Sequence, residues 1–151
     1  MPTTVDGVDA FGDFVGKELG HSEWLTISQE RVNLFADATD DHQWIHVDPE
    51  RAKGGPFGVA IAHGYLTLSL IPVYLPEILE VQGMSMGINY GCNKVRFPSP
   101  VIVDSKLRMG VSVGGVEDVK GGVQVNFDVT LEVEDAAKPS CVAQVVYRYF
   151  Y

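Results

Sequence analysis

The sequence predicts an α+β fold in which one antiparallel sheet curls around a central helix. In the last third of the chain apolar and polar residues alternate, without interruption from Val123 to Val133, which is typical of long antiparallel strands with one solvated face. The stretch from Ala62 to about Leu79 is apolar on nearly every side, as expected of a helix that a sheet surrounds. Helical patterns come first and strand patterns last, and this order favours the α+β class.

The chain begins with a segment that we expect to be an extended lead-in, because residues 1–20 are rich in Gly and Asp and have few apolar anchors. Residues 24–27 predict a short strand. Ser28 is a suitable N-cap, since its hydroxyl can accept a hydrogen bond from a free amide of the first helical turn. The helix that follows places residues at helical spacing toward the core: Val32, Phe35, Ala36 and Thr39.

Residues 39–46 are polar and have no regular period, so we expect a loop there. Asp48 followed by Pro49 predicts the cap and first position of a short helix that runs to about Lys53. Residues 54–56, Gly-Gly-Pro, end it. In the central helix that comes next, Pro72 and Pro76 should kink or shorten the helix, because proline lacks an amide donor.

Three long strands are predicted from the alternation, over residues 101–113, 123–133 and 141–151, and one or two shorter strands between Met86 and Phe97. Glycine pairs at 114–115 and 121–122 should mark loop ends, and residues 135–139 a turn. At 151 residues and 46% hydrophobic composition, the whole chain, residues 1–151, has the size and the core material of a single domain.

Charge and composition exclude several classes of function. Lys and Arg total 11 against 20 Asp and Glu, a net charge of −9, so nucleic acid and anionic membrane surfaces should repel the chain. The uncharged stretch 54–76 contains four glycines, three prolines and His63, which favours a buried helix over a membrane span. The acidic start is unlike a secretory signal. Two cysteines without zinc-type spacing predict neither disulfides nor a metal site, which fits the cytoplasm.

Asp41 and His46 are the first candidates for chemistry. A carboxylate beside an imidazole can exchange protons with a substrate near neutral pH. Five positions apart, the two side chains converge on neither a helix nor a strand, but they can meet in an irregular loop. The spacing is equally compatible with structural roles, in which Asp41 caps a turn and His46 is a partly buried, hydrogen-bonded histidine.

The segment Asp41-His42-Gln43-Trp44-Ile45-His46-Val47-Asp48 resembles the signature Asp-x-Asn-Pro-(Ile/Leu)-His-x-(Asp/Glu) of the MaoC-like, (R)-specific enoyl-CoA hydratases, which have the hot-dog fold. Two further segments are similar to this family: Ala62-His63-Gly64, and Asn93 to Val101. The resemblance extends over roughly residues 20–150. It implies a hot-dog domain, with the antiparallel sheet wrapped around a long central helix.

The resemblance also implies site roles. Asp41 would be the general base on water, and His46 would position that water and supply a proton to Cα. The backbone N–H of Gly64 would bind the thioester oxygen. That last role is physically sensible, because negative charge develops on this oxygen and a helix N-terminus offers free N–H donors.

Three positions depart from the family pattern, namely Asp40, Gln43 and Trp44, where the family has Gly, Asn and Pro. Asp41 keeps the family's spacing to the histidine. Gln43 retains a hydrogen-bonding amide on a longer arm and is expected to contact substrate. Lys94 and Arg96 are candidate ligands for coenzyme A phosphates and, alternatively, solvated strand charges. The substrate itself would carry coenzyme A, so neither a metal nor a further cofactor is expected.

The sequence thus predicts an enzyme, a lyase that hydrates short or medium trans-2-enoyl-CoA to the (R)-3-hydroxyacyl product and catalyses the reverse dehydration. One alternative is a hot-dog acyl-CoA thioesterase, in which the carboxylate directs water at the carbonyl carbon; fold alone does not separate the two. A second is a non-catalytic subunit that binds acyl thioesters. A carrier-protein thioester is an alternative substrate. Because an unpaired sheet edge invites pairing, a homodimer is expected.

Overall fold

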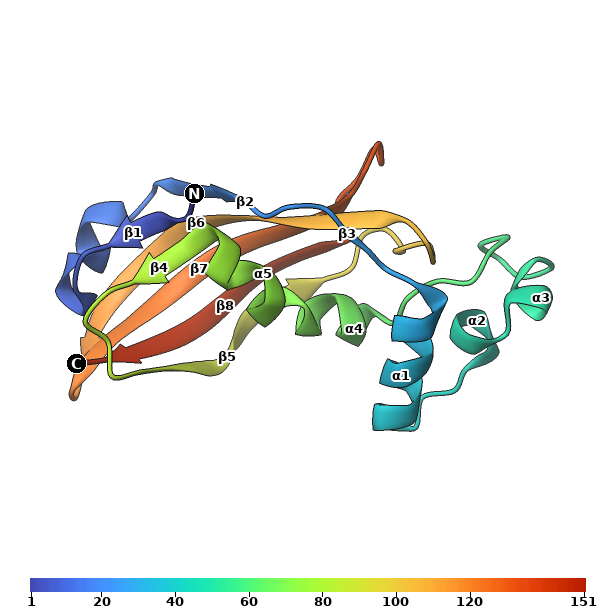
Figure 1. The fold of residues 1–151 in the computed structure, drawn as a ribbon, viewed down its shortest axis with the longest axis horizontal. Coiled ribbons are helices and arrows are strands. Elements are labelled where there is room, and N and C mark those ends of the chain that lie inside the picture. Colours follow the sequence, from blue (N-terminus) through green and yellow to red (C-terminus); the bar gives the residue numbers. More distant parts are fainter.

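The computed structural model describes residues 1–151 and contains one large antiparallel sheet (Figure 1). Its strands lie in the order β2-β6-β7-β8-β5, and β3 pairs with the first residues of β6. The strands of this sheet are β2 Glu18–His21, β3 Leu25–Thr26, β5 Met86–Arg96, β6 Lys106–Val119, β7 Gly122–Val133 and β8 Cys141–Phe150. The predicted α+β class and the hot-dog arrangement are confirmed.

The alternation that predicted the strands corresponds to the two faces of the sheet. In β7 the odd-numbered residues from Val123 to Leu131 are buried, while the even-numbered ones lie on the outer face. The prediction for β6 was wrong at both ends. Residues 101–105 form a turn, and the strand continues through Gly114 and Gly115 to Val119. A β-bulge between Val113 and Gly115 accommodates the glycines within the strand, so they mark a local irregularity and not a loop.

The central helix packs on the inner face of the sheet and is interrupted once (Figure 1). It consists of α4 Gly64–Ser69 and α5 Ile71–Ile78, with Pro72 in the first turn of α5 and Pro76 inside it. The buried Tyr74 hydroxyl donates a hydrogen bond to the Leu107 carbonyl (3.0 Å), which fastens α5 to β6. Neither piece, nor any other helix, is long and apolar enough to cross a lipid bilayer.

The first 20 residues differ from the extended lead-in that we expected. They contain β1 Thr3–Val5, the 3-10 helix η1 Val8–Phe14 and β2. β1 pairs in parallel with β4 Leu79–Val81, directly after α5. Val5, Val8 and Phe11 are buried in the main core. These contacts join residues about 75 positions apart, and a local sequence pattern does not reveal them.

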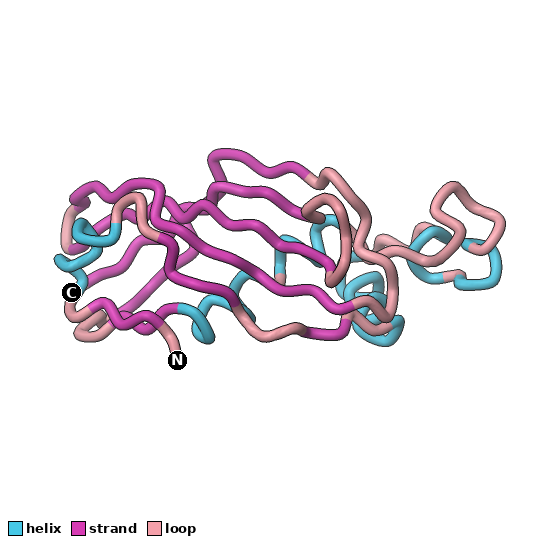
Figure 2. The backbone as a smooth tube through the Cα atoms, turned by 90° about the horizontal axis from the view of Figure 1, so that it is seen from above, coloured by secondary structure: helices cyan, strands magenta, loops and turns pink.

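Three helices, α1 Gln29–Thr39, α2 Trp44–Val47 and α3 Pro49–Ala52, lie beyond one end of the sheet. The view from above shows residues of this region projecting away from the strands (Figure 2). The 29-residue hydrophobic core has no member between Val32 and Ala62. The segment that contains α2 and α3 is therefore held mainly by its own contacts and by those with α1 and the start of α4.

Strand β5 forms an open edge of the sheet. It pairs with β8 on one side only, and most of its 11 residues are exposed. The exposed residues include Met86 (52%), Ile88 (37%) and Tyr90 (57%). Register shifts between Asn89 and Gly91 and between Cys92 and Lys94 add bulges to this edge. A long edge with apolar side chains is a template for pairing with a second chain.

Candidate active site

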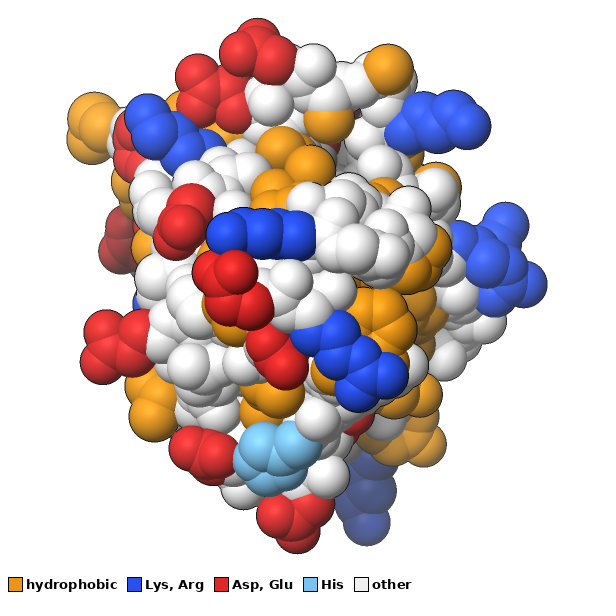
Figure 3. All heavy atoms as spheres, turned by 90° about the vertical axis from the view of Figure 1, so that its right-hand side faces the viewer, with side chains coloured by type: hydrophobic (Ala, Val, Ile, Leu, Met, Phe, Trp, Pro, Cys, Tyr) orange, Lys and Arg blue, Asp and Glu red, His pale blue; other side chains and the backbone are white.

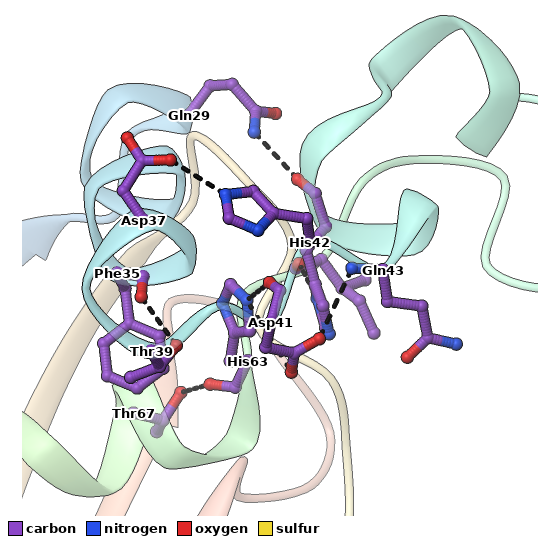
Figure 4. A network of polar contacts seen from close by, with 11 residues as sticks. Gln29, Phe35, Asp37, Thr39, Asp41, His42, Gln43, His63 and Thr67 are labelled. Carbon is purple, nitrogen blue, oxygen red and sulfur yellow. Dashed lines mark hydrogen bonds and ion pairs between the residues drawn. The ribbon is translucent and has the colours of Figure 1, made fainter.

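The candidate site begins at the C-terminus of α1. Ser28 caps that helix as predicted, with its Oγ accepting from the Arg31 amide, and Asp40 ends it in the left-handed conformation (φ 60°). The chain then turns, and Asp41 Oδ1 accepts a hydrogen bond from the Gln43 amide at 3.3 Å. The Asp41 side chain is half-exposed (52%). This loop directs the carboxylate toward the N-terminus of α4 (Figure 4).

The polar composition of residues 39–46 predicted a loop, but His46 lies on the one-turn helix α2. Its side chain is buried, and Nδ1 lies 2.7 Å from the Ile61 carbonyl oxygen. A carbonyl only accepts hydrogen bonds, so Nδ1 carries the proton and Nε2 presents a lone pair. Burial lowers the pKa of His46 below its ordinary value, although the Ile61 hydrogen bond acts in the opposite direction. The resting ring is therefore a neutral base.

His63 completes the cluster. It is buried directly before α4, and its Nε2–H donates to the Asp41 carbonyl oxygen at 2.9 Å. Its ring stacks on that of His46, with centroids 3.9 Å apart and planes at 24°. The structure thus brings Asp41, His46 and His63 together, with one donor atom of each within 4.8 Å of the others.

This cluster has the composition of a metal site but not its geometry. Each histidine donates one ring N–H to a backbone carbonyl, as metal-bound histidines do. The two rings, however, are stacked almost face to face. Ring lone pairs lie in the ring planes, so those of two stacked imidazoles run side by side and do not converge on one ion. The arrangement suits proton transfer better than coordination.

His46 also lines a cavity of about 300 Å³. Gly64 forms part of the same wall at the start of α4, where its N–H has no intrahelical acceptor. A side chain at Gly64 would lie 3.1 Å from the Phe97 ring, so the space beside this N–H depends on glycine. The lining residues share a mostly apolar or hydroxyl character: Phe57, Ile61, Ala62, Thr67, Phe97, Pro98, Ser99, Pro100, Val101 and Ser140.

Two buried hydroxyl groups in this wall were missed in the sequence. Thr67 and Ser140 are 2% exposed. Each hydroxyl donates one long hydrogen bond of 3.5 Å to a backbone carbonyl, that of His63 for Thr67 and that of Pro100 for Ser140. Thr67 follows Gly64 by three positions, so helical spacing could have placed it on the same face. Ser140 approaches from the turn before β8, and no local signal connects it with α4.

The other predicted substrate contacts lie outside the cavity wall. The Gln43 side chain points away from Asp41 and His63 (Figure 4). Lys94 and Arg96 lie exposed on β5, where an Arg96 guanidinium nitrogen donates to the Val95 carbonyl. Trp44 does not line the cavity either: Arg51 lies over its ring at 4.4 Å, and Gly55 packs against it. Trp44 therefore holds α2 against α3.

The molecular surface at this end carries charges of both signs. Basic and acidic side chains are interspersed with apolar ones (Figure 3). The net charge of −9 is thus not concentrated into one acidic surface there. An anionic ligand can approach this end without crossing a uniformly repulsive field.

Sequence comparison identifies relatives of this chain. A family profile described as "MaoC like domain" matches residues 10–135. The 3-hydroxyacyl-thioester dehydratase Z of Mycobacterium tuberculosis is 54% identical over 147 residues, which is 97% of each chain. The nodulation protein N of Rhizobium meliloti is 46% identical over 135 residues, covering 85% of this chain and 82% of its own.

Solved structures show the same fold at low sequence identity. The monoamine oxidase regulatory protein of Archaeoglobus fulgidus superimposes with a TM-score of 0.81 at 20% identity over 99% and 97% of the two chains. The (R)-hydratase of A. caviae gives 0.73 at 23% identity over 88% and 94%. A chain of the ChsH1–ChsH2 complex of Mycobacterium tuberculosis gives 0.69 at 19% over 89% and 97%. From the family profile, these sequence identities and its fold, the chain belongs to the MaoC-like dehydratase family.

Proposed function

We propose that the protein catalyses the reversible addition of water to a trans-2-enoyl thioester, which forms the 3-hydroxyacyl thioester. One observation supports this most strongly: a buried neutral imidazole, His46, and a free backbone donor, Gly64, line the same cavity. The first can move a proton, and the second can stabilise negative charge on an oxygen. Hydration of a conjugated thioester needs both at once.

The protonation state of His46 determines the order of the steps in the proposed hydration. Asp41 and His46 orient a water molecule, whose oxygen bonds to Cβ while one of its O–H bonds breaks. The conjugated electrons move to the thioester oxygen and form an enolate. Because neutral His46 has no proton on Nε2, the proton that it gives to Cα must first come from the water, directly or through Asp41. Dehydration follows the same steps in reverse.

In this mechanism the enolate oxygen lies at the N-terminus of α4. There the Gly64 N–H meets the negative charge in a mostly apolar cavity, where a hydrogen bond is stronger than in water. Thr67, Ser99 and Ser140 supply hydroxyl groups in the same wall. Phe57 and Phe97 supply apolar surface for the substrate.

The preferred substrate that we propose is a short or medium enoyl-CoA that yields the (R)-3-hydroxyacyl product, as the family resemblance implies. Coenzyme A phosphates would be bound by exposed cations, for which Lys94 and Arg96 remain candidates. The expected compartment is the cytoplasm, and both cysteines are free thiols. No cofactor beyond the CoA of the substrate is part of this mechanism.

We further propose a homodimer formed through β5. The unpaired edge of this strand and its exposed Met86, Ile88 and Tyr90 support pairing with a second copy. Antiparallel pairing of the two β5 edges would continue the sheet from one chain into the next. A heteromeric assembly, as in the ChsH1–ChsH2 complex, is the alternative that a test must distinguish.

The decisive experiment follows the loss of conjugated enoyl-thioester absorbance with crotonyl-CoA. Wild type should turn over, while Asp41→Asn and His46→Gln should lose about two or more orders of magnitude in kcat, the effect of removing an acid/base group. His42→Gln is the matched control, since exposed His42 pairs with Asp37 outside the cavity. Each variant must be folded.

Other outcomes point to other functions. A wild type that is silent on short and medium enoyl-CoA would contradict hydration of CoA esters, and carrier-protein thioesters would be tested next. Release of free thiol from a saturated acyl-CoA would identify a thioesterase. Saturable binding without turnover, unchanged in Asp41→Asn, would identify a binding subunit.

A further inference from the structure

We propose that His63 is a positioning residue, which holds both members of the acid/base pair in place without lining the substrate cavity. This inference deepens the proposed function and rests on it. His63 belongs to neither the Asp41 loop nor α2, but it contacts both. It also directly precedes Gly64.

The first contact fixes Asp41. The His63 Nε2–H donates to the Asp41 backbone carbonyl at 2.9 Å, and the same nitrogen lies 3.9 Å from the carboxylate Oδ2. The residues are 22 positions apart, so this bond connects the N-terminus of α4 with the loop after α1 (Figure 4). Apart from it, the half-exposed Asp41 is held only by its local contact with the Gln43 amide.

The second contact fixes His46. The two imidazoles stack at 3.9 Å between centroids, and the Phe35 ring lies 4.9 Å from His63. The Ile61 hydrogen bond fixes one edge of the His46 ring, while the stack fixes its plane. With both contacts in place, Nε2 has one direction in which to present its lone pair.

The third observation is a polar atom without a partner. His63 is 3% exposed, and its Nδ1 is buried without a hydrogen bond. Such an atom costs stability. A phenylalanine would provide the same flat ring without that cost, but it lacks the Nε2–H that Asp41 uses. Histidine supplies a donor within a small five-membered ring, whereas the other aromatic donors, Trp and Tyr, have larger side chains.

Position matters because the groups act on one substrate. His63 connects the proton-transfer side of the site to Gly64, so a shift of α4 moves both sides together. The ionisable groups that face His46 are Asp41 on the loop and His63 before α4. From α1, Phe35 packs on His63, and the charged Asp37 is already paired with the exposed His42.

Two variants separate the two contacts. His63→Gln keeps an N–H donor of similar reach and removes the ring, while His63→Phe keeps the ring and removes the donor. We expect each to lower kcat with crotonyl-CoA by about tenfold or more, since misplacement of about 1 Å costs up to 100-fold. KM should stay within about twofold, because His63 does not line the cavity. His42→Gln should match the wild type.

A pH profile and nuclear magnetic resonance add readouts that a merely structural role would not change. In His63→Gln the acid limb of kcat/KM should move to higher pH, because His46 loses a buried neighbour that lowers its pKa. Titration of ¹⁵N-labelled His46, followed by nuclear magnetic resonance in the absence of substrate, should show the same increase in the pKa of His46. This second measurement still tests the inference if no enoyl thioester is a substrate, in which case only the proposed function fails.

Three results would overturn the proposal: wild-type kcat in both variants, unchanged titration of His46 in His63→Gln, or failure of both variants to fold. The last would assign His63 to the core alone. A fall in kcat with unchanged KM, together with the shifted His46 titration, would support it.

Discussion

At the scale of single residues, burial affects the pKa of His46 more than neighbouring charges do. His46 is buried in the wall of a mostly apolar cavity and is neutral at rest. Asp41 is half-exposed and keeps contact with solvent. Acid/base chemistry needs two groups whose environments differ in this way.

The burial of His46 predicts how activity and stability depend on pH. Because its pKa is lowered from 6.5, His46 remains a base below pH 6.5, and kcat/KM should fall only at lower pH. In the same window unfolded chains bind a proton that folded chains do not, so the free energy of unfolding should decrease as pH falls through 6.5. A pH–rate profile and urea titrations measure the two effects.

His46→Gln provides the control for the stability effect. Without the imidazole, the part of the pH dependence that begins near 6.5 should be reduced. An unchanged profile in this variant would assign the dependence to another group.

At the scale of elements, the segment that contains α2 and α3 is packed around the Trp44 ring. A side chain at Gly55 would lie 2.8 Å from the Trp44 ring, whereas one at Gly54 would meet only a carbonyl oxygen at 3.8 Å. Gly55→Ala should therefore lower the free energy of unfolding by about 1–3 kcal/mol, the usual cost of overpacking. Gly54→Ala should stay within about 0.5 kcal/mol. Equal effects of the two substitutions in urea titrations would contradict the role of Trp44.

The elements differ in how well the sequence predicts them, and the range of the interactions explains why. The alternation in β7 and β8 and the caps Ser28 and Asp48 are local, and they lie where expected. β1 depends on pairing with β4, far along the chain. The continuous β6 depends on a bulge that needs the neighbouring β7. Neither has a local signature.

The same distinction applies to the site. Asp41, His46 and Gly64 could be proposed from motifs, but the one-turn helix under His46 and the stacking of His63 arise from tertiary packing. Ser140 enters the cavity from a turn 76 residues beyond Gly64. Sequence spacing contains no information on such contacts.

At the scale of the whole molecule, the proposed homodimer depends on the unpaired edge of β5. Ile88 and Val142 are equally exposed (37%), but Ile88 lies on the edge strand and Val142 on β8, which is paired on both sides. Ile88→Lys should weaken the dimer by at least tenfold, since a desolvated charge costs more than about 1.4 kcal/mol. Val142→Lys should not.

Sedimentation velocity over a range of concentrations measures this difference. Wild type and Val142→Lys should sediment as dimers where Ile88→Lys contains monomers. A wild type that is monomeric at every concentration would contradict the homodimer, and a dimer that forms only with a second, related chain would indicate a heteromer.

The absence of core residues between Val32 and Ala62 has a consequence for how this protein is assayed. The long strands lie in the sheet, while His46 lies in a segment that contributes no residue to the main core. Such segments open at lower free energy than the core. Opening of this segment alone would remove only the eight residues of α2 and α3 from the helices. A nearly normal circular dichroism spectrum therefore does not show that the active site is intact, so an inactive preparation with such a spectrum does not by itself identify a catalytic residue.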